Sequence, residues 1–152
     1  MSAMQTTLTP PYATLTPDCV LNALDSVGLR GDGRLLALNS YENRVYQLGI
    51  EDGPPLVAKF YRPGRWPDAA ILEEHTFVAA LAAQEIPVVA PLALNCATLH
   101  THAGFRFALY PRRGGRMPEF DKAETLEWMG RFIGRIHAIG AIEPFQHRPA
   151  LD

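Results

Sequence analysis

The stretch Leu56-Val-Ala-Lys-Phe-Tyr61 is an apolar run of strand type that contains one charged side chain. Side chains alternate between the two faces of a β-strand, so Val57, Lys59 and Tyr61 share one face and the other three residues share the opposite face. Lys59 therefore has a defined direction. Taken alone, it is equally well explained as a lysine of an edge strand, where a charge discourages aggregation.

A helix is predicted to begin at residue 67 or 68 and to run to about residue 84. With successive residues about 100° apart, Glu74 falls at the centre of the apolar face, whereas Glu73 lies toward its border and is expected to be a solvated surface acid. A carboxylate in a buried face is costly unless a cation meets it, so Glu74 is the expected partner of Lys59. The alternative is a rotated helix that exposes both acids. The apolar face consists of Ala70, Ile71, Phe77, Val78 and Leu81.

A strand lysine and a helix carboxylate that meet beneath a nucleotide hold the phosphates of ATP in kinases. Lys59 and Glu74 are candidates for that pair. The polar turn between the first two predicted strands is a candidate phosphate cover, through backbone N–H groups and a serine hydroxyl. It lacks the glycines of a glycine-rich loop, so any polar hairpin would give a similar signal. Its residues are Ser40, Tyr41, Glu42 and Asn43.

The remaining pattern predicts an α+β domain whose five-stranded antiparallel sheet has one helix inserted after the third strand. The expected strands are 34–39, 43–50, 56–61, 88–94 and 105–110. A first helix, capped by Thr16, is expected to end near Val27, and a last helix spans about 121–139 with Gly140 as its stop. The predicted divisions are a flexible leader at 1–15, a lobe at 16–111, a linker at 112–120 and a final segment at 121–152.

Length and composition indicate one domain, since the chain has 152 residues of which 47% are hydrophobic. A net charge of -2 gives no global basic field, so neither nucleic acid nor a membrane surface is an expected partner. Cys19 and Cys96 have no metal-ligand spacing. Without a signal-peptide pattern or an apolar run of membrane-spanning length, a cytoplasmic location is expected.

Four runs of the sequence resemble a known family. They are Asn39-Ser-Tyr-Glu-Asn-Arg-Val-Tyr-Gln47, Ala58-Lys-Phe-Tyr-Arg-Pro63 with Arg65-Trp66, Ile71-Leu-Glu-Glu-His75, and Met129-Gly-Arg-Phe-Ile-Gly-Arg-Ile-His137. They are similar to the bacterial stress response kinase A family, within the aminoglycoside phosphotransferase and choline kinase superfamily of protein-kinase-like folds. The resemblance covers about residues 14–149. The implied fold is a small kinase lobe with a helix of the αC type, followed by a hinge and the first helix of a larger lobe.

The resemblance implies transfer of the γ-phosphoryl group of ATP, with Mg²⁺, to serine or threonine hydroxyls of a protein during the response to envelope and oxidative stress. Lys59 would hold the α- and β-phosphates, Glu74 would orient Lys59, and the turn from Ser40 to Asn43 would cover the phosphates. A hinge after the fifth strand would meet adenine through backbone groups. Its residues are Tyr110, Pro111, Arg112 and Arg113.

The family's catalytic loop, a His-Gly-Asp pattern followed by His and Asn, has no counterpart around the five histidines of this chain. The resemblance therefore implies an N-terminal fragment whose catalytic base and magnesium ligands lie in a missing lobe. We expect the chain to bind ATP weakly, to lack kinase activity by itself and to self-associate through uncovered surfaces. Two alternatives stay open: a kinase lobe for an amino alcohol, sugar or aminoglycoside, and a non-catalytic regulatory module.

Overall fold

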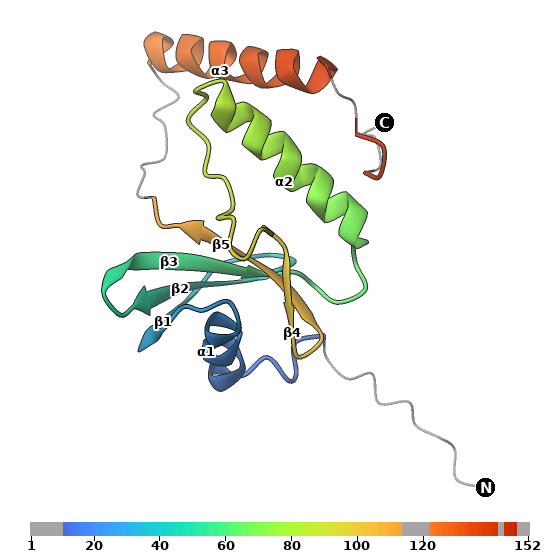
Figure 1. The fold of residues 1–152 in the computed structure, drawn as a ribbon. Coiled ribbons are helices and arrows are strands. Elements are labelled where there is room, and N and C mark those ends of the chain that lie inside the picture. The colour runs from blue at the N-terminus through green and yellow to red at the C-terminus, as the bar shows by residue number, and fades with distance from the viewer. Residues whose placement is uncertain (1–10, 114–121, 143–144, 149–152) are drawn as a thin grey trace, which may run out of the picture.

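The structure, a computed structural model, describes residues 11–113, 122–142 and 145–148 of the chain. Helix α1 lies beneath a twisted sheet, α2 crosses above the sheet, and α3 lies over α2 (Figure 1). The five strands of the sheet have the order β1-β2-β3-β5-β4, and all neighbours are antiparallel. The predicted α+β class with a five-stranded antiparallel sheet is confirmed.

The first three strands follow one another as hairpins and position Lys59. They are β1 (Gly31–Leu38), β2 (Arg44–Ile50) and β3 (Gly53–Phe60). In the sheet, Lys59 lies opposite Val45 of β2 and opposite Ala108 of β5 (Phe105–Pro111). Directly opposed residues of antiparallel strands point to the same face, so these three side chains form one row across the sheet.

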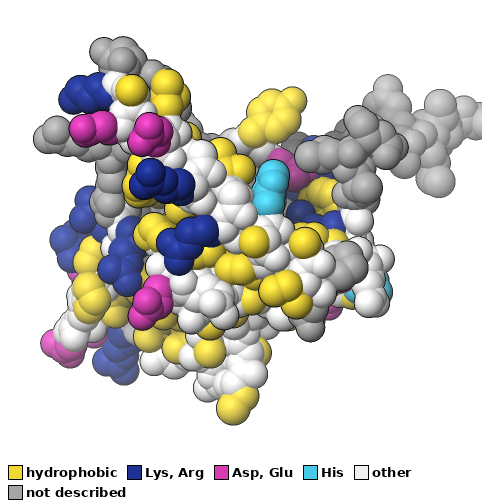
Figure 2. Space-filling model, turned by 90° about the horizontal axis from the view of Figure 1, so that it is seen from above, with side chains coloured by type: hydrophobic (Ala, Val, Ile, Leu, Met, Phe, Trp, Pro, Cys, Tyr) yellow, Lys and Arg dark blue, Asp and Glu magenta, His cyan; other side chains and the backbone are white. Residues whose placement is uncertain are grey.

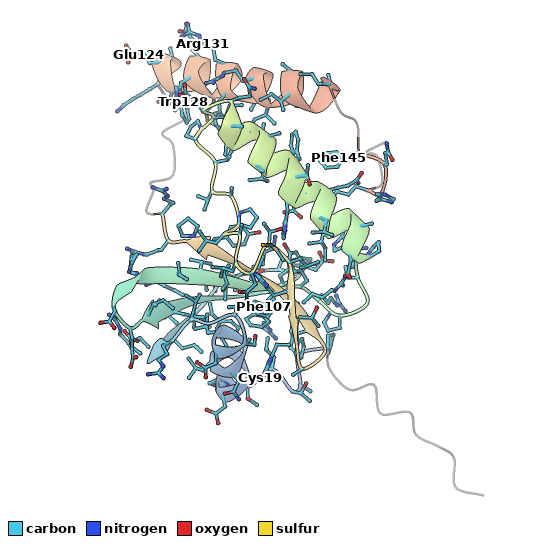
Figure 3. All side chains as sticks on the ribbon, viewed as in Figure 1. Cys19, Phe107, Glu124, Trp128, Arg131 and Phe145 are labelled. Carbon is cyan, nitrogen blue, oxygen red and sulfur yellow. The ribbon has the colours of Figure 1, made fainter. Side chains whose placement is uncertain are left out.

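The lower face of the sheet forms the main core with α1 (Pro17–Ser26). Thr16 caps this helix as predicted, because its hydroxyl accepts a hydrogen bond from the N–H of Cys19 at 3.2 Å. Phe107 lies between the sheet and α1 (Figure 3). Fully buried side chains of this core include Val20, Leu24, Leu48, Phe60, Phe107 and Leu109.

The lobe begins earlier than predicted. Of the expected flexible leader, the structure describes residues 11–15, and two of these, Tyr12 and Leu15, pack against the domain. Leu15 is buried in the core, and the Tyr12 ring stacks on Phe105 with centroids 6.3 Å apart. The Tyr12 hydroxyl also donates to the carbonyl of Glu42 at 2.8 Å. Burial of these side chains fixes a segment whose Thr- and Pro-rich composition suggests disorder.

The fourth strand is not where the sequence pattern places it. Residues 88–94 form no strand, although the N–H of Leu92 donates to the carbonyl of Leu109 at 2.7 Å. Pro91 has no N–H to give to a ladder, which explains why a single backbone bond is not extended into a strand.

The strand beside β5 is instead β4 (His100–His102), in the segment expected to be a polar connection. A two-residue turn joins β4 to β5, with positive φ at Ala103 and Gly104. Two consecutive positive φ angles match the twist of a tight hairpin. The count of five strands is therefore right, although one strand was assigned to the wrong segment.

The two long helices are α2 (Asp68–Ala83) and α3 (Ala123–Ile142). Helix α2 has the predicted extent, with Gln84 as its C-terminal cap. Gly140 does not end α3 as predicted but lies at the crossing of the helices, where a Cβ would stand 3.5 Å from the Phe77 ring of α2. Residues 114–120 of the predicted linker, and the predicted helix start at 121, lie outside the described residues. In the described part of the chain, no helix has the length and apolar character needed to cross a membrane.

Candidate functional site

The lysine–carboxylate pair predicted from the sequence is formed in the structure. Lys59 points away from the α1 core, and its Nζ lies 3.6 Å from Oε1 of Glu74 on α2. Nζ also lies 5.0 Å from the centroid of the Tyr61 ring, within cation–π range. The side chains of Lys59 and Glu74 are 25% and 30% exposed, so a ligand can reach both.

Helix α2 buries the face that the helical wheel predicts. Its buried residues lie on both sides of Glu74 around the helix, which rules out the rotated helix with both acids exposed. Glu73, however, is not the free surface acid expected. Its carboxylate accepts hydrogen bonds from the N–H groups of Gln146 at 2.6 Å and His147 at 2.7 Å. The buried residues of α2 are Ala70, Ile71, His75 and Leu81.

Arg148 is a second cation beside Glu74, and sequence reasoning missed it. Its Nη2 lies 2.5 Å from Oε2 of Glu74, whereas Lys59 faces Oε1. The carboxylate thus bridges two cations. Arg148 stands 74 residues from Glu74 along the chain, so no local pattern signals this contact.

An open apolar surface lies on the sheet beside Lys59. Leu36 is 57% exposed and Leu38 is 37% exposed, so these leucines belong to no closed core. The strand registers place them in two neighbouring rows of side chains on the upper face. Alternation along each strand cannot identify which side chains of neighbouring strands lie in one row, because the rows depend on the register between strands. The rows are Leu38-Val45-Lys59-Ala108 and Leu36-Gln47-Val57-Tyr110.

The predicted phosphate-covering turn joins β1 to β2 at the end of the Lys59 row. Ser40 and Tyr41 are exposed, and the Tyr41 ring has no shielding from solvent. These residues are free to meet a ligand that lies over the sheet.

Glu42 and Asn43, by contrast, anchor the turn to the segment that follows β3. The Glu42 carboxylate pairs with Nε of Arg65 at 2.6 Å and accepts from Nε1 of Trp66 at 3.4 Å. The hydrogen bond from Arg65 lowers the pKa of Glu42, which keeps the acid charged. Oδ1 of Asn43 accepts from the N–H of Arg62 at 3.3 Å. Their side chains thus hold the turn in place.

The predicted hinge continues from β5 at the edge of the apolar surface. Tyr110 and Pro111 end this strand, and Tyr110 lies opposite Val57 of β3. Burial raises the pKa of the Tyr110 phenol, so it stays protonated. Arg112 and Arg113 follow with exposed side chains. The structure therefore brings Tyr110 to the site and leaves both arginines at its rim.

A buried hydrogen-bonded chain, also missed by sequence reasoning, ties α2 to the sheet. His75 is 4% exposed, and its Nε2 and Nδ1 lie 2.8 Å from the hydroxyl groups of Tyr61 and Thr98 respectively. The Tyr110 phenol lies near enough to Tyr61 that each group affects the pKa of the other. Burial lowers the pKa of His75 and raises that of Tyr61, so both remain neutral. The available signal was a histidine about 40° from Ile71 on the helical wheel, at the border of the predicted apolar face.

The arrangement suits a ligand with an anionic part and a flat apolar part. Lys59 and Arg148 face a single carboxylate, which leaves positive charge beside the exposed turn. The leucines of β1 offer apolar contact on the same face. The described residues contain no group of three or more His, Cys, Asp or Glu side chains that could hold a metal ion.

Comparisons with known proteins show the family to which this chain belongs. Residues 34–152 match the phosphotransferase enzyme family. Stress response kinase A of Escherichia coli (strain K12) is 49% identical over 140 residues, which make up 92% of this chain and 43% of that protein. The serine/threonine protein kinase RdoA of Salmonella typhimurium (strain LT2) is 46% identical over 138 residues, or 91% of this chain and 42% of that protein. The chain thus spans less than half the length of these relatives.

A solved structure shares the fold. Amicoumacin kinase hAmiN, in complex with AMP-PNP, Ca²⁺ and Ami, matches with a TM-score of 0.69 at 22% identity, over 87% of this chain and 41% of that chain. This likeness supports the small-lobe architecture of a protein-kinase-like fold. The resemblance to stress response kinase A that the sequence motifs indicate is confirmed by the similarity to those proteins. Because the family match extends over most of its length, the chain belongs to the phosphotransferase enzyme family.

Proposed function

We propose that this chain is the nucleotide-binding lobe of an ATP-dependent kinase. The observation that carries the proposal is the Lys59–Glu74 pair, 3.6 Å apart, at the border of the open apolar surface. A cation oriented by a carboxylate beside such a surface suits a ligand that joins a phosphate chain to a planar base. Membership of a phosphotransferase family supports this assignment.

Each part of the site has a role in the proposal. Lys59 binds oxygens of the α- and β-phosphates, and Glu74 orients its ammonium group. The adenine ring lies on the apolar rows of β1, β2 and β3 and meets the backbone of residues 110–113. The turn between β1 and β2 covers the phosphates with backbone N–H groups and the Ser40 hydroxyl.

Mg²⁺, when bound with ATP, would supply neutralisation of charge on the phosphate oxygens. The described residues offer no cluster of ligands for it. In this proposal its protein ligands and the catalytic base therefore come from the part of the relatives that this chain does not span. The chain itself contributes binding and orientation of the nucleotide.

The proposed acceptor of the whole protein is a serine or threonine hydroxyl of another protein. Support comes from relatives named stress response kinase A and serine/threonine protein kinase RdoA. We assign γ-phosphoryl transfer in the cytoplasm to the whole protein, and expect the 152-residue chain alone to be inactive. Phosphoryl transfer by this chain that disappears in Lys59→Ala would contradict that expectation.

A small hydroxyl compound is the second candidate acceptor. The fold is shared with amicoumacin kinase, so the lobe by itself favours neither class of acceptor. Assay of the full-length protein against protein substrates and against amino alcohols, sugars and aminoglycosides distinguishes them. Transfer only to the small compounds would replace the protein-kinase assignment.

The nucleotide assignment is tested by titrating the chain with the ATP analogue AMP-PNP in a calorimeter. We expect weak binding by the wild type and at least about tenfold weaker binding by Lys59→Ala and Glu74→Ala, because each removes a charge-assisted contact. Arg131→Ala is the control, since the Arg131 side chain on α3 is 80% exposed. No measurable wild-type binding, or equal binding by all four proteins, would remove the assignment. Binding that depends on neither residue would favour a regulatory module.

A further inference from the structure

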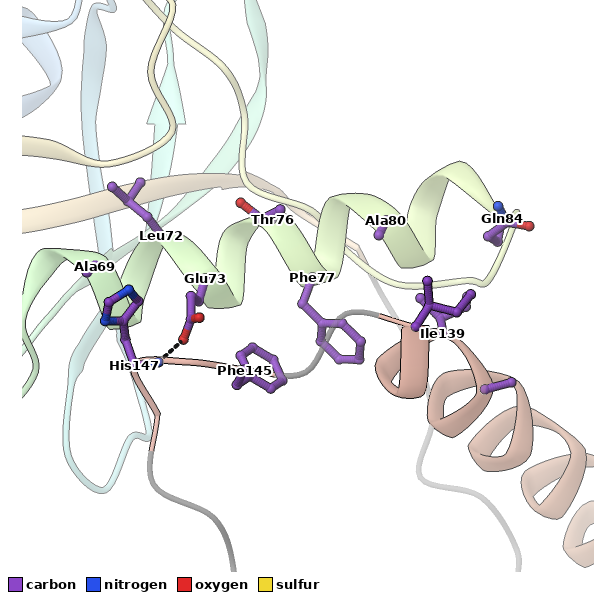
Figure 4. Close-up of a pocket in the computed structure, with 12 residues that line it drawn as sticks. Ala69, Leu72, Glu73, Thr76, Phe77, Ala80, Gln84, Ile139, Phe145 and His147 are labelled. Carbon is purple, nitrogen blue, oxygen red and sulfur yellow. Dashed lines mark hydrogen bonds between the residues drawn. The ribbon is translucent and has the colours of Figure 1, made fainter.

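The segment of residues 145–148, hereafter the strap, is tied to the surface of α2. The backbone N–H groups at positions 146 and 147 donate to the Glu73 carboxylate at 2.6 Å and 2.7 Å. Phe145 packs edge-to-face on Phe77, with ring centroids 5.1 Å apart. Phe145 and His147 lie along one side of α2 (Figure 4), where they help to line a cavity of about 620 Å³ between α2 and α3.

The docked strap favours a charged Glu73. Burial alone would raise the pKa of Glu73, but the two N–H donors from the strap bring it below its ordinary value. The strap is therefore held by an ionised carboxylate as well as by aromatic packing. This fixes the position of the residue that follows.

Arg148, the last residue of the strap, contacts three groups around Glu74. Its Nη2 lies 2.5 Å from Oε2 of Glu74, and its Nε donates to the carbonyl of Ala70 at 3.2 Å. The guanidinium also lies 5.0 Å from the centroid of the Trp66 ring. A planar guanidinium can make all these contacts at once, whereas a lysine ammonium cannot.

These contacts hold the Glu74 carboxylate at one oxygen while the other oxygen faces Lys59. Without these contacts, a glutamate side chain that is 30% exposed would sample several rotamers and form hydrogen bonds with water. The charges also suit a phosphate ligand. The Glu74 carboxylate orients Lys59, and because Lys59 and Arg148 share this one carboxylate, the site keeps a net positive charge.

We propose that Arg148 is a positioning residue of the nucleotide site, which holds Glu74 so that Glu74 keeps Lys59 directed at the phosphates. The inference rests on the proposed function of the lobe and extends it, because it makes docking of the strap part of preparing the site. Arg148 acts through Glu74 and does not itself touch the nucleotide.

A double-mutant cycle on AMP-PNP affinity tests this role. Arg148→Gln should raise the dissociation constant about tenfold, the lower end for a hydrogen bond to a charged group. In the Glu74→Gln background the same substitution should change affinity by less than about threefold, because the carboxylate through which it acts is gone. Arg148→Lys should fall between wild type and Arg148→Gln. The matched control is Arg131→Gln, because Arg131 is exposed and pairs with Glu127 at 3.8 Å on its own helix.

The outcomes separate this inference from the function on which it rests. If Lys59→Ala weakens binding and Arg148→Gln does not, the role of Arg148 is overturned and the nucleotide site stands. If Arg148→Gln weakens binding equally in both backgrounds, Arg148 acts by another route and the positioning role is overturned. If neither substitution affects binding, both proposals fail. Far-UV circular dichroism of each variant checks folding, and Arg148→Lys keeps the test decisive should Arg148→Gln unfold.

Discussion

Replacing His75 by leucine tests whether the buried hydrogen-bonded chain fixes α2 to the sheet. His75 is 4% exposed and lies 2.8 Å from the hydroxyl groups of both Tyr61 and Thr98. A neutral hydrogen bond contributes about 0.5–1.5 kcal/mol net, and a buried group left without a partner costs about 1–3 kcal/mol. Thr98 is half-buried and can turn to water, and the Tyr61 phenol keeps Tyr110 as a polar neighbour. We therefore expect a loss of about 2 kcal/mol in the free energy of unfolding.

Urea unfolding followed by circular dichroism measures this loss. Tyr61→Phe should cost about 1 kcal/mol, and the double variant with His75→Leu should cost less than the sum, because removing both partners leaves no orphaned polar group. His137→Leu is the control, since His137 is exposed on α3 and its loss should stay within about 0.5 kcal/mol. Additive losses for the pair, or a His75→Leu protein as stable as wild type, would refute the reasoning.

Three further expectations follow from the structure. Burial lowers the pKa of His75 and His100 below the ordinary histidine value of 6.5, so the unfolded chain binds protons at higher pH than the folded chain does. The free energy of unfolding should therefore fall as the pH drops below 6.5, and it should fall less steeply in His75→Leu. An unchanged slope in that variant would count against a neutral buried His75. Val57→Trp should fill the apolar surface and weaken AMP-PNP binding at least about tenfold, as measured by titration. Urea unfolding should show little change in stability. Wild-type affinity in this variant would mean that the adenine base does not bind on this surface. Trp128 is 55% exposed on α3, so sedimentation velocity should detect concentration-dependent self-association that decreases in Trp128→Glu; a monomer at all concentrations would contradict this.

The view from above shows the surfaces involved in that last expectation. Hydrophobic side chains are spread over the face that α3 occupies, with Lys and Arg gathered toward one side (Figure 2). Described apolar residues exposed on α3 include Leu126, Trp128 and Ile133. Apolar surface of this kind on a helix favours association with another protein surface.

Local patterns predicted the parts of this fold that depend on local physics. Period-two alternation separated Lys59 from Ala58 and Phe60, which the structure buries in the core, and the helical wheel of α2 selected Glu74 over Glu73 as the partner of Lys59. A buried carboxylate requires a cation, and this rule works without knowledge of the fold. The α+β class followed from the order of strand and helix patterns.

The errors arise from one missed local hairpin and from contacts between distant segments. The strand at 88–94 looked favourable by composition, but the place beside β5 was taken by His100–His102, whose short polar run gives no strand signal. Arg148 and the strap reach α2 from more than seventy residues away, so neither could be foreseen from spacing. Tyr12 likewise anchors a segment of disordered composition through packing on Phe105.

Mapping AMP-PNP on the isotope-labelled chain by NMR tests the central claim most directly. The nucleotide-binding assignment places the ligand over the upper face of the sheet. We expect saturable chemical-shift changes at Lys59, at Val57, in the turn of Ser40 and Tyr41, and at Tyr110, together with loss of these changes in Lys59→Ala. Changes confined to the cavity between α2 and α3, around Phe77 and Ile139, would contradict the assignment.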